Sequence, residues 1–302
     1  MTTSTATKRL VVAINPTASF GKGREVGPAA VAELRRLGHE VVSLSESDFP
    51  SLVDAATRAL ADGPDALVVV GGDGMVNLGV NLVAETATPL GIIPSGTGND
   101  MARGLGIPIG DTAEAVRVVE RALTREPRVI DAGRVTSAAG VRWFACVLSA
   151  GFDSVVTERA NRMRRPRGRA RYTIALLLEL ARLRPVVYRI TVDGVEMQER
   201  ALLACVGNNV SFGGGMRVTP DAVLDDGLLD ALVVRPLSRI QFLRIFPRVF
   251  RGEHITDPRV SIVRGRRIGI EADGMVAYGD GERFGPLPVD IECVPGALRV
   301  LA

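Results

Sequence analysis

The chain has 302 residues, of which 46% are hydrophobic and 24% are charged, and its formal net charge is only +3. This length suits two domains, and the composition is typical of a globular protein with a sizeable core. The near balance of 37 basic and 34 acidic side chains excludes a strongly basic nucleic-acid-binding protein, so we expect no nucleic-acid partner.

Cysteine usage and the start of the sequence predict a cytoplasmic protein. The three cysteines lie far apart and none forms a CxxC pair, so we expect buried thiols in a reducing compartment. The first residues lack the basic-then-apolar pattern of a secretion signal. No uncharged apolar run is long enough to span a bilayer, so any membrane association is expected to be peripheral, at the inner face.

The first third of the chain alternates strands and helices. Strands are predicted over 10–14, 41–44, 67–70 and 90–93, and helices over 28–37, 52–60 and 112–123, with two more from Val76 and Met101. Repeated alternation of this kind is typical of a doubly wound parallel sheet. We therefore predict an α/β N-terminal domain over residues 1–130.

From about residue 129 onwards, short β-type runs replace this alternation. They cover 141–148, 186–192, 201–206, 228–234, 268–271 and 289–294. Turns are expected at Asp193-Gly194 and Asp273-Gly274, and helical inserts over roughly 154–183 and 238–250. We predict a mostly antiparallel β-sandwich domain over residues 131–302.

Two glycine-rich loops follow two of the predicted strands. One is Gly71-Gly72-Asp73-Gly74, and the other is Ser95-Gly96-Thr97-Gly98-Asn99-Asp100. Loops after parallel strands lie at the carboxyl edge of the sheet, where glycines let backbone amides point at an anion. A carboxylate beside a phosphate repels it unless a metal lies between them, so this combination predicts phosphoryl transfer. Asp100 also suits the cap of the helix that begins at Met101.

A third loop follows the first strand and contains Asn15-Pro16-Thr17-Ala18 and Gly21-Lys22-Gly23. It is not a Walker A motif, because Gly23 stands where serine or threonine must follow the lysine. Since the loop ends a strand of the same sheet, we expect it to line the same ligand site, with a plain surface turn as the alternative.

The loop Gly71–Gly74 with Asn77, followed by Gly96–Asp100, resembles the catalytic domain of the diacylglycerol kinase family over nearly the whole chain. The resemblance implies a soluble bacterial lipid kinase, with ATP between a nucleotide-binding domain and a β-sandwich domain that receives the lipid. It places Asp73 and Asp100 in a carboxylate network. It implies an ATP site made of Asn15, Pro16, Thr17, Ala18, Gly72, Asp73, Gly74, Met75, Val76, Asn77, Gly96 and Thr97.

Two segments of the second half extend the likeness. Asp280-Gly281-Glu282 is similar to the turn that carries the family's catalytic base, which assigns that role to Glu282. Asp273-Gly274 is followed by a methionine, which cannot take a proton, so we assign it to a plain turn. The segment Val223–Leu228 is similar to the family's Leu-Asp-Asp-Gly segment. It implies a structural Mg²⁺ held by Asp226 and by main-chain oxygens of Val223 and Leu228, with a solvated β-turn as the alternative.

The implied activity is ATP- and Mg²⁺-dependent transfer of a phosphate to a lipid hydroxyl, with diacylglycerol converted to phosphatidic acid as the first expectation. A sphingoid-base or other glycerolipid kinase and an NAD kinase-like enzyme remain alternatives, because they use similar loops. Met75 stands where the family usually has threonine, which also leaves open a non-catalytic nucleotide-binding protein.

Seven arginines lie within Arg159–Arg171, just before an apolar segment over 172–180. Near an anionic membrane, each arginine contributes about 1 kcal/mol of attraction. A peripheral membrane contact is therefore one interpretation, and a solvated helix face or a homodimer contact is equally consistent with the pattern. The seven are Arg159, Arg162, Arg164, Arg165, Arg167, Arg169 and Arg171.

Overall fold

The computed structural model describes residues 6–15, 23–163, 165 and 169–302. Contacts divide the chain into two compact units, the first containing residues up to 132 together with 295–302, and the second containing residues 133–294. The predicted boundary at residue 130 is close to this division. The segment 295–302 was assigned to the second domain from the sequence, but its last strand pairs with the sheet of the first unit.

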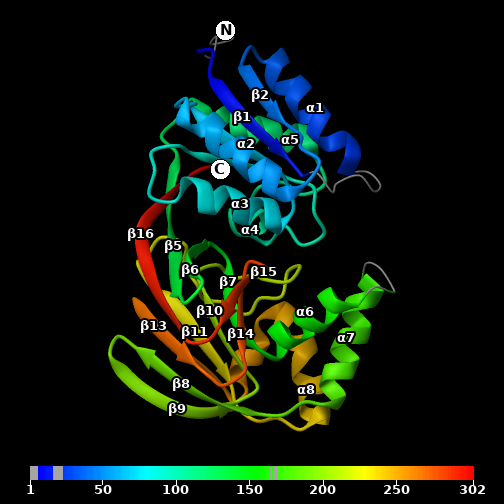
Figure 1. Ribbon diagram of the computed structural model, residues 1–302, viewed down its shortest axis with the longest axis vertical. Helices are drawn as coiled ribbons and strands as arrows, with labels where there is room; N and C mark the ends of the chain where they lie inside the picture. The colour runs from blue at the N-terminus through cyan, green and yellow to red at the C-terminus, as the bar shows by residue number, and fades with distance from the viewer. Residues whose placement is uncertain (1–5, 16–22, 164, 166–168) are drawn as a thin grey trace. The chain divides into compact units, whose positions relative to one another are not determined.

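The first unit contains a parallel sheet in the strand order β2-β1-β3-β4 (Figure 1). The strands are β1 (Arg9–Ile14), β2 (Glu40–Leu44), β3 (Ala66–Gly71) and β4 (Leu90–Pro94). The end of β16 (Val289–Leu301) continues the sheet, because Val300 and Leu301 pair in parallel with Leu90 and Gly91 of β4. All residues of β3 and β4 are buried, as expected for strands covered on both faces.

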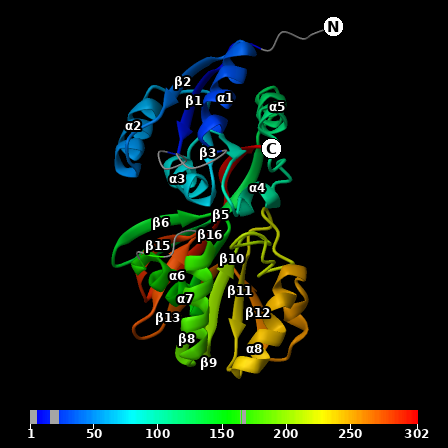
Figure 2. The same ribbon diagram turned by 90° about the vertical axis from the view of Figure 1, so that its right-hand side faces the viewer.

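Five helices cover this sheet and confirm the predicted doubly wound α/β architecture (Figure 2). Helix α1 packs against α5, and α2 and α3 pack against β1 and β3. Asp48 caps α2 and Asp111 caps α5, each by accepting a backbone N–H of the first turn. The helices are α1 (Gly23–Arg36), α2 (Phe49–Ala61), α3 (Asp73–Val83), α4 (Asp100–Gly104) and α5 (Thr112–Leu123).

The second unit confirms the predicted antiparallel β-sandwich. One sheet has the order β12-β11-β10-β7-β14-β15, and the other contains β13, β8 and β9 beside the first part of β16, with β5 and β6 paired off it. Side chains of both sheets share one apolar core that includes Phe144, Tyr188 and Phe284. The strands are β5 (Arg128–Ser137), β6 (Gly140–Phe144), β7 (Val147–Gly151), β8 (Val186–Val192), β9 (Val195–Ala201), β10 (Leu203–Gly207), β11 (Leu229–Val234), β12 (Val260–Gly265), β13 (Arg267–Glu271), β14 (Val276–Gly279) and β15 (Glu282–Pro286).

Each predicted helical insert of the second unit contains more than one helical segment. The first holds α6 (Phe152–Arg162) and α7 (Arg169–Ala181), and the second holds α8 (Arg239–Ile245) followed by the 3₁₀ helix η1 (Phe246–Arg251). A further 3₁₀ helix, η2 (Glu253–Thr256), leads into β12. Within the described residues, none of the helices combines the length and apolarity needed to cross a membrane.

Candidate functional site

The two glycine-rich loops of the first unit lie side by side because β3 and β4 are neighbouring parallel strands. The backbone N–H of Ser95 donates a hydrogen bond of 2.8 Å to the carbonyl of Gly71, which joins the two loops at their bases. Gly72 and Gly96 approach so closely that a Cβ on Gly72 would lie 3.0 Å from the Cα of Gly96. A Cβ at either position would collide with the backbone of the other loop, so the close contact of the two loops requires glycine at both positions.

Asp73 ties the second loop to the first. Its carboxylate accepts the backbone N–H of Asn99 at 3.0 Å and that of Asp100 at 2.7 Å. A Cβ on Gly98 would collide with the same carboxylate. The sequence placed Asp73 among the nucleotide ligands and the catalytic carboxylates. In the structure its two oxygens hold the Gly96–Asp100 loop in place.

The carboxylate of Asp73 is held in an unfavourable electrostatic position. Burial raises the pKa of Asp73, and the neighbouring charge of Asp100 raises it further. Hydrogen bonds from the backbone N–H groups of residues 99, 100 and 73 lower it, but they offset only part of the increase. Buried carboxylates whose pKa is raised by a neighbouring carboxylate are common in functional sites.

Asn99 lies in the second glycine-rich loop, and the sequence pattern predicted no role for it. Its backbone is left-handed, with φ of 55°, which asparagine tolerates better than most residues. Its side chain accepts the Gly96 N–H at 2.9 Å and donates to the Gly96 carbonyl at 2.8 Å. The Asn99 side-chain amide therefore holds the backbone of its own loop in place. The pattern that could have indicated this role is an asparagine between the glycines of the loop and the start of α4.

The arrangement leaves donors that suit phosphate oxygens. Within the described part of the chain, the loop N–H groups of Thr97 and Gly98 have no hydrogen-bond acceptor. Helix α3 begins at Asp73 without a side-chain cap, so the first-turn N–H groups and the positive end of the helix dipole face the loop region. Backbone donors at a helix start beside a glycine loop are the usual chemistry of a phosphate site.

Among the other predicted nucleotide ligands that the structure describes are Met75, Val76, Asn77 and Asn15. Met75 and Val76 are buried, and both of their N–H groups donate to the Gly72 carbonyl. Because its amide is used in this way, Met75 contributes its apolar side chain, which packs over Gly71. Asn77 is buried, and its carbonyl accepts Asn81 at 2.8 Å. Asn15 donates its N–H to Val70, while Pro16, Thr17 and Ala18 lie outside the described residues.

Glu282, the predicted catalytic base, is the first residue of β15 in the second unit. Its side chain is half-buried, and within the described residues it has neither a hydrogen bond nor an ion pair. The carboxylate is therefore available to accept a proton. Asp273 and Gly274 form a turn between β13 and β14, as predicted, with φ of 68° at Gly274.

Asp280 anchors the turn before Glu282 to the backbone of residues 145–147, and the sequence did not predict this role. Its carboxylate accepts backbone N–H groups from Ala145, Cys146 and Val147, at 2.9, 2.9 and 3.1 Å. These bonds also explain why the predicted strand over 141–148 is split into β6 and β7. The N–H groups of residues 145 and 146 point to Asp280 instead of to a neighbouring strand.

We expect Asp280→Ala to lower the free energy of unfolding by about 3 kcal/mol, because three backbone donors lose a buried, charged acceptor. Urea denaturation monitored by circular dichroism measures the loss. The matched control is Asp273→Ala, which removes an exposed aspartate from a similar turn and should change stability by less than about 0.5 kcal/mol. Equal losses in the two variants would contradict the role of Asp280.

The Asp226 carboxylate, expected to hold a structural Mg²⁺, already has partners on both oxygens. Oδ1 accepts the N–H of Leu228 at 3.1 Å, and Oδ2 pairs with the guanidinium of Arg264 on β12. Arg264 also lies 3.2 Å from the buried carboxylate of Asp230. A Mg²⁺ on Asp226 therefore does not fit this arrangement unless Arg264 moves away. Of the two residues expected to supply main-chain oxygens, Val223 is exposed and Leu228 donates its N–H to Asp226.

Replacing Asp226 with alanine should lower the free energy of unfolding by about 1 kcal/mol, because Arg264 loses one partner and the Leu228 N–H loses its acceptor. Differential scanning fluorimetry with and without EDTA measures the effect. We expect the melting temperature of the unmodified protein to be the same in both buffers. A lower value in EDTA would show that a metal ion, and not Arg264, is the resident cation.

The predicted arginine cluster is only partly available to a partner. Arg159 pairs with Glu179 of α7, and Arg162 pairs with Glu158 at 2.9 Å. Arg165 is exposed. Arg164, Arg167 and the side chain of Arg169 lie outside the described residues.

A parallel α/β unit with two joined glycine loops, followed by an antiparallel sandwich, defines a phosphotransferase of the lipid and NAD kinase type. Residues 9–135 match the model of the diacylglycerol kinase catalytic domain. Residues 146–302 match the model of the YegS C-terminal NAD kinase beta sandwich-like domain. The chain belongs to the diacylglycerol kinase family and is a lipid kinase, which confirms the resemblance found in the sequence.

Individual relatives agree with this assignment over almost the whole chain. A diacylglycerol kinase of Mycobacterium tuberculosis (strain ATCC 25618 / H37Rv) is 42% identical over 289 residues, covering 95% of this chain and 93% of the relative. A diacylglycerol kinase of Bacillus subtilis (strain 168) is 29% identical, covering 93% and 92%. The crystal structure of a diacylglycerol kinase from Bacillus anthracis str. Sterne has the same fold, with a TM-score of 0.69, 22% identity and coverage of 97% and 96%.

Proposed function

We propose that this lipid kinase transfers the γ-phosphate of ATP to a lipid hydroxyl and that diacylglycerol is the acceptor. The observation that supports this most strongly is the pair of glycine loops that Asp73 joins, since they present unpaired backbone donors at the start of a helix. The relatives from M. tuberculosis and B. subtilis, both called diacylglycerol kinase, support the choice of acceptor.

In this proposal the phosphates of ATP bind the N–H groups of Thr97 and Gly98 and lie at the positive end of the α3 dipole, where the N–H groups of Met75 and Val76 are already used by Gly72. Mg²⁺ bound to the triphosphate offsets its charge beside Asp73 and Asp100 and makes the γ-phosphate a better acceptor of the attacking oxygen. Asp73 keeps the two loops in register, so the donors are oriented before the nucleotide arrives. The remaining nucleotide contacts are assigned to Asn15, Pro16, Thr17, Ala18, Gly72, Gly74, Met75, Val76, Asn77 and Gly96.

Glu282 is proposed as the general base. It accepts the proton of the lipid hydroxyl as that oxygen bonds to the γ-phosphorus and the bond to the β-phosphate oxygen breaks. Its lack of a partner within the described residues supports this role, because a carboxylate held in an ion pair is a weaker proton acceptor. Asp280 supports the turn that presents it.

An apolar cavity of about 110 Å³ in the second unit supports a lipid acceptor. It lies between the six-stranded sheet and the helices, and Phe152, Phe242 and Ile245 are among its lining residues. Burial raises the pKa of Asp153 and lowers the pKa of His254, the two titratable side chains in the lining other than a cysteine. Both shifts favour the neutral form, so the cavity suits the uncharged hydrocarbon chain of a lipid.

The test is transfer of radiolabelled γ-phosphate from ATP in the presence of diacylglycerol, a sphingoid base or NAD. We expect label in the organic phase with diacylglycerol, identified as phosphatidic acid by mass spectrometry of the product. Label in a phosphorylated sphingoid base would show that the acceptor is a sphingoid base and not diacylglycerol. Label in NADP would show that the acceptor is a dinucleotide and not a lipid. Nucleotide binding without transfer to any acceptor would show a protein that lacks this activity.

A further inference from the structure

The outward faces of α7 and α8 carry large apolar side chains where a solvent-exposed helix would carry polar ones. On α7, Ile174, Leu177 and Leu178 are spaced i, i+3, i+4 and are all exposed, with 56% of Leu177 accessible. On α8 and η1, Ile240 is 65% accessible, and Leu243 and Phe250 are at least half exposed. We call these six side chains, together with Arg182, Arg184 and Arg244 of the same segments, the helical face.

Both parts of the helical face belong to one side of the second unit. Arg239, at the start of α8, donates hydrogen bonds to the carbonyls of Leu180 and Ala181 at the end of α7. Figure 2 shows α7 and α8 on the side of this unit that faces the viewer. The end of α7 and the start of α8, where Ile240 lies, are therefore neighbours on this side of the unit.

The charge of the helical face is positive. Within the described residues, Arg182, Arg184 and Arg244 form no ion pair. The acidic side chains of α7 and of the neighbouring helices α6 and η2 are neutralised. Arg159 pairs with Glu179, Arg162 and Arg283 pair with Glu158, and Arg251 pairs with Glu253. A partner of this face must therefore accept apolar side chains and supply negative charge.

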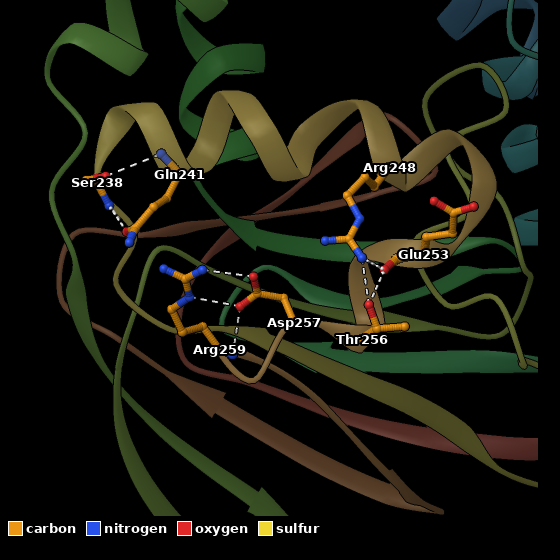
Figure 3. A network of polar contacts seen from close by, with 7 residues as sticks. All are labelled: Ser238, Gln241, Arg248, Glu253, Thr256, Asp257 and Arg259. Atoms are coloured by element: carbon orange, nitrogen blue, oxygen red, sulfur yellow. Dashed lines mark hydrogen bonds and ion pairs between the residues drawn. The ribbon is translucent and has the colours of Figure 1, made fainter.

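Side-chain hydrogen bonds tie the segment that contains α8, η1 and η2 at its start and at its end. The Ser238 hydroxyl and the Gln241 side chain cap the start of α8 reciprocally (Figure 3). Arg248 donates to the carbonyl of Glu253 and to the hydroxyl of Thr256, which joins η1 to η2 (Figure 3). The segment that carries Ile240, Leu243 and Phe250 is therefore tied by side-chain hydrogen bonds at its start and at its end.

The inner side of the same segment lines the apolar cavity. Phe242 and Ile245 of α8 and Phe246 of η1 are lining residues, while Ile240 and Leu243 of the same helix are exposed. One short segment therefore has an apolar surface on both sides. A partner on the outside lies directly over the cavity to which the proposed function assigns an acyl chain.

We propose that the helical face docks on an anionic phospholipid bilayer. Its six apolar side chains enter the headgroup region, and Arg182, Arg184 and Arg244 meet lipid phosphates. This inference rests on the proposed function, because diacylglycerol is a membrane lipid and its kinase must reach it at a bilayer. It differs from the sequence-based interpretation, because the contact lies on α7 and α8 and not on the partly neutralised Arg159–Arg171 segment.

Sedimentation with vesicles tests the apolar part of the face. The full-length protein should bind vesicles of phosphatidylcholine with phosphatidylglycerol, and bind vesicles of phosphatidylcholine alone at least tenfold more weakly. The double variant Leu177→Asp/Leu243→Asp should lose binding to both. The matched control is Val141→Asp/Val195→Asp, which changes two equally exposed valines on strands of the same unit and should bind as the unmodified protein does. Equal binding by both double variants would overturn the proposal.

The arginines are tested separately. Arg182→Gln and Arg244→Gln should each weaken binding to the anionic vesicles about fivefold and leave the residual binding to phosphatidylcholine unchanged. Arg58→Gln, an exposed arginine of α2 in the first unit, is the control and should have no effect. An identical effect of all three substitutions would mean that only net charge matters, which would overturn the assignment to this face.

Two further measurements separate this inference from the proposed function. Transfer to a short-chain diglyceride in solution needs no bilayer, so Leu177→Asp/Leu243→Asp should phosphorylate it at the unmodified rate. Vesicle binding of the expected pattern without any lipid phosphorylation would leave the docking face standing and reject the activity. Light scattering tests the remaining occupant: if the double variant turns a dimer into a monomer and still binds vesicles, the face is a contact between two copies and the proposal fails.

Discussion

Replacing Glu282 with glutamine is expected to lower the rate of phosphoryl transfer by about 10²- to 10⁴-fold and to leave ATP affinity unchanged. Glutamine keeps the shape of the side chain but cannot accept the proton of the attacking hydroxyl. Because the carboxylate has no partner within the described residues, its removal breaks no ion pair or hydrogen bond of the fold, and stability should not change. The rate is measured with diacylglycerol as acceptor, and ATP affinity by titration calorimetry.

Asp273→Asn is the control for this experiment, because it alters another Asp-Gly turn of the second unit without changing Glu282. It should keep the full rate. A Glu282→Gln variant with normal turnover would refute the assignment of the base. A variant that also loses ATP affinity would instead show that Glu282 contributes to nucleotide binding.

The second large effect is expected for Asp73→Ala, which should abolish measurable ATP binding and lower the free energy of unfolding by about 2 to 4 kcal/mol. Alanine removes the acceptor of the Asn99 and Asp100 N–H groups, each of which then lies in a largely buried position without a partner. The Gly96–Asp100 loop loses its tie to α3, so its phosphate donors lose their orientation. Titration calorimetry and urea denaturation measure the two effects.

Asp111→Ala is a matched control, because it removes an aspartate that accepts one backbone N–H at the start of α5, on the surface of the same unit. It should cost about 1 kcal/mol and leave ATP affinity unchanged. If Asp73→Ala bound ATP normally, the loops would not depend on this carboxylate. The proposed phosphate site would then have lost its principal support.

The pH dependence of stability gives an independent check on Asp73. Burial and Asp100 raise its pKa above the ordinary value of 3.8, so the folded state binds a proton more tightly than the unfolded state. The stabilisation from this proton is complete below pH 3.8 and is lost as the pH rises through the raised pKa. Asp73→Asn lacks this contribution. The difference in unfolding free energy between the unmodified protein and the Asn variant should therefore shrink as the pH rises through that window.

The positions of the glycine loops could be predicted from the sequence, because each loop follows a short apolar strand. The pattern fixes where a strand stops, and parallel pairing then places both loops at one edge. The hydrogen bonds within the site could not be predicted in this way. Asp73 and Asn99 are 26 positions apart, and nothing in either loop alone shows that one carboxylate accepts two N–H groups of the other.

The same limit explains the differences in the second unit. The run over 141–148 is apolar except for Arg142 and predicts one strand, yet Asp280, more than 130 positions later, accepts the N–H groups of residues 145 and 146 in its middle. Asp226 was predicted as a metal ligand because its segment is similar to one in the family. In the structure its carboxylate pairs with Arg264, which comes from a strand 38 positions away. Local patterns located many of the strands and helices, but the partners of these polar side chains come from distant parts of the chain.

The path of β16 has a practical consequence for dissecting this enzyme. Its residues 289–292 belong to the ladder of β13, and residues 300 and 301 complete the sheet beside β4. A recombinant fragment that stops near residue 132 would expose the edge of β4 to solvent and invite aggregation. Circular permutation or grafting of 295–302 onto such a fragment is therefore needed before nucleotide binding can be studied in isolation. Any C-terminal affinity tag, in turn, is attached to the nucleotide-binding half.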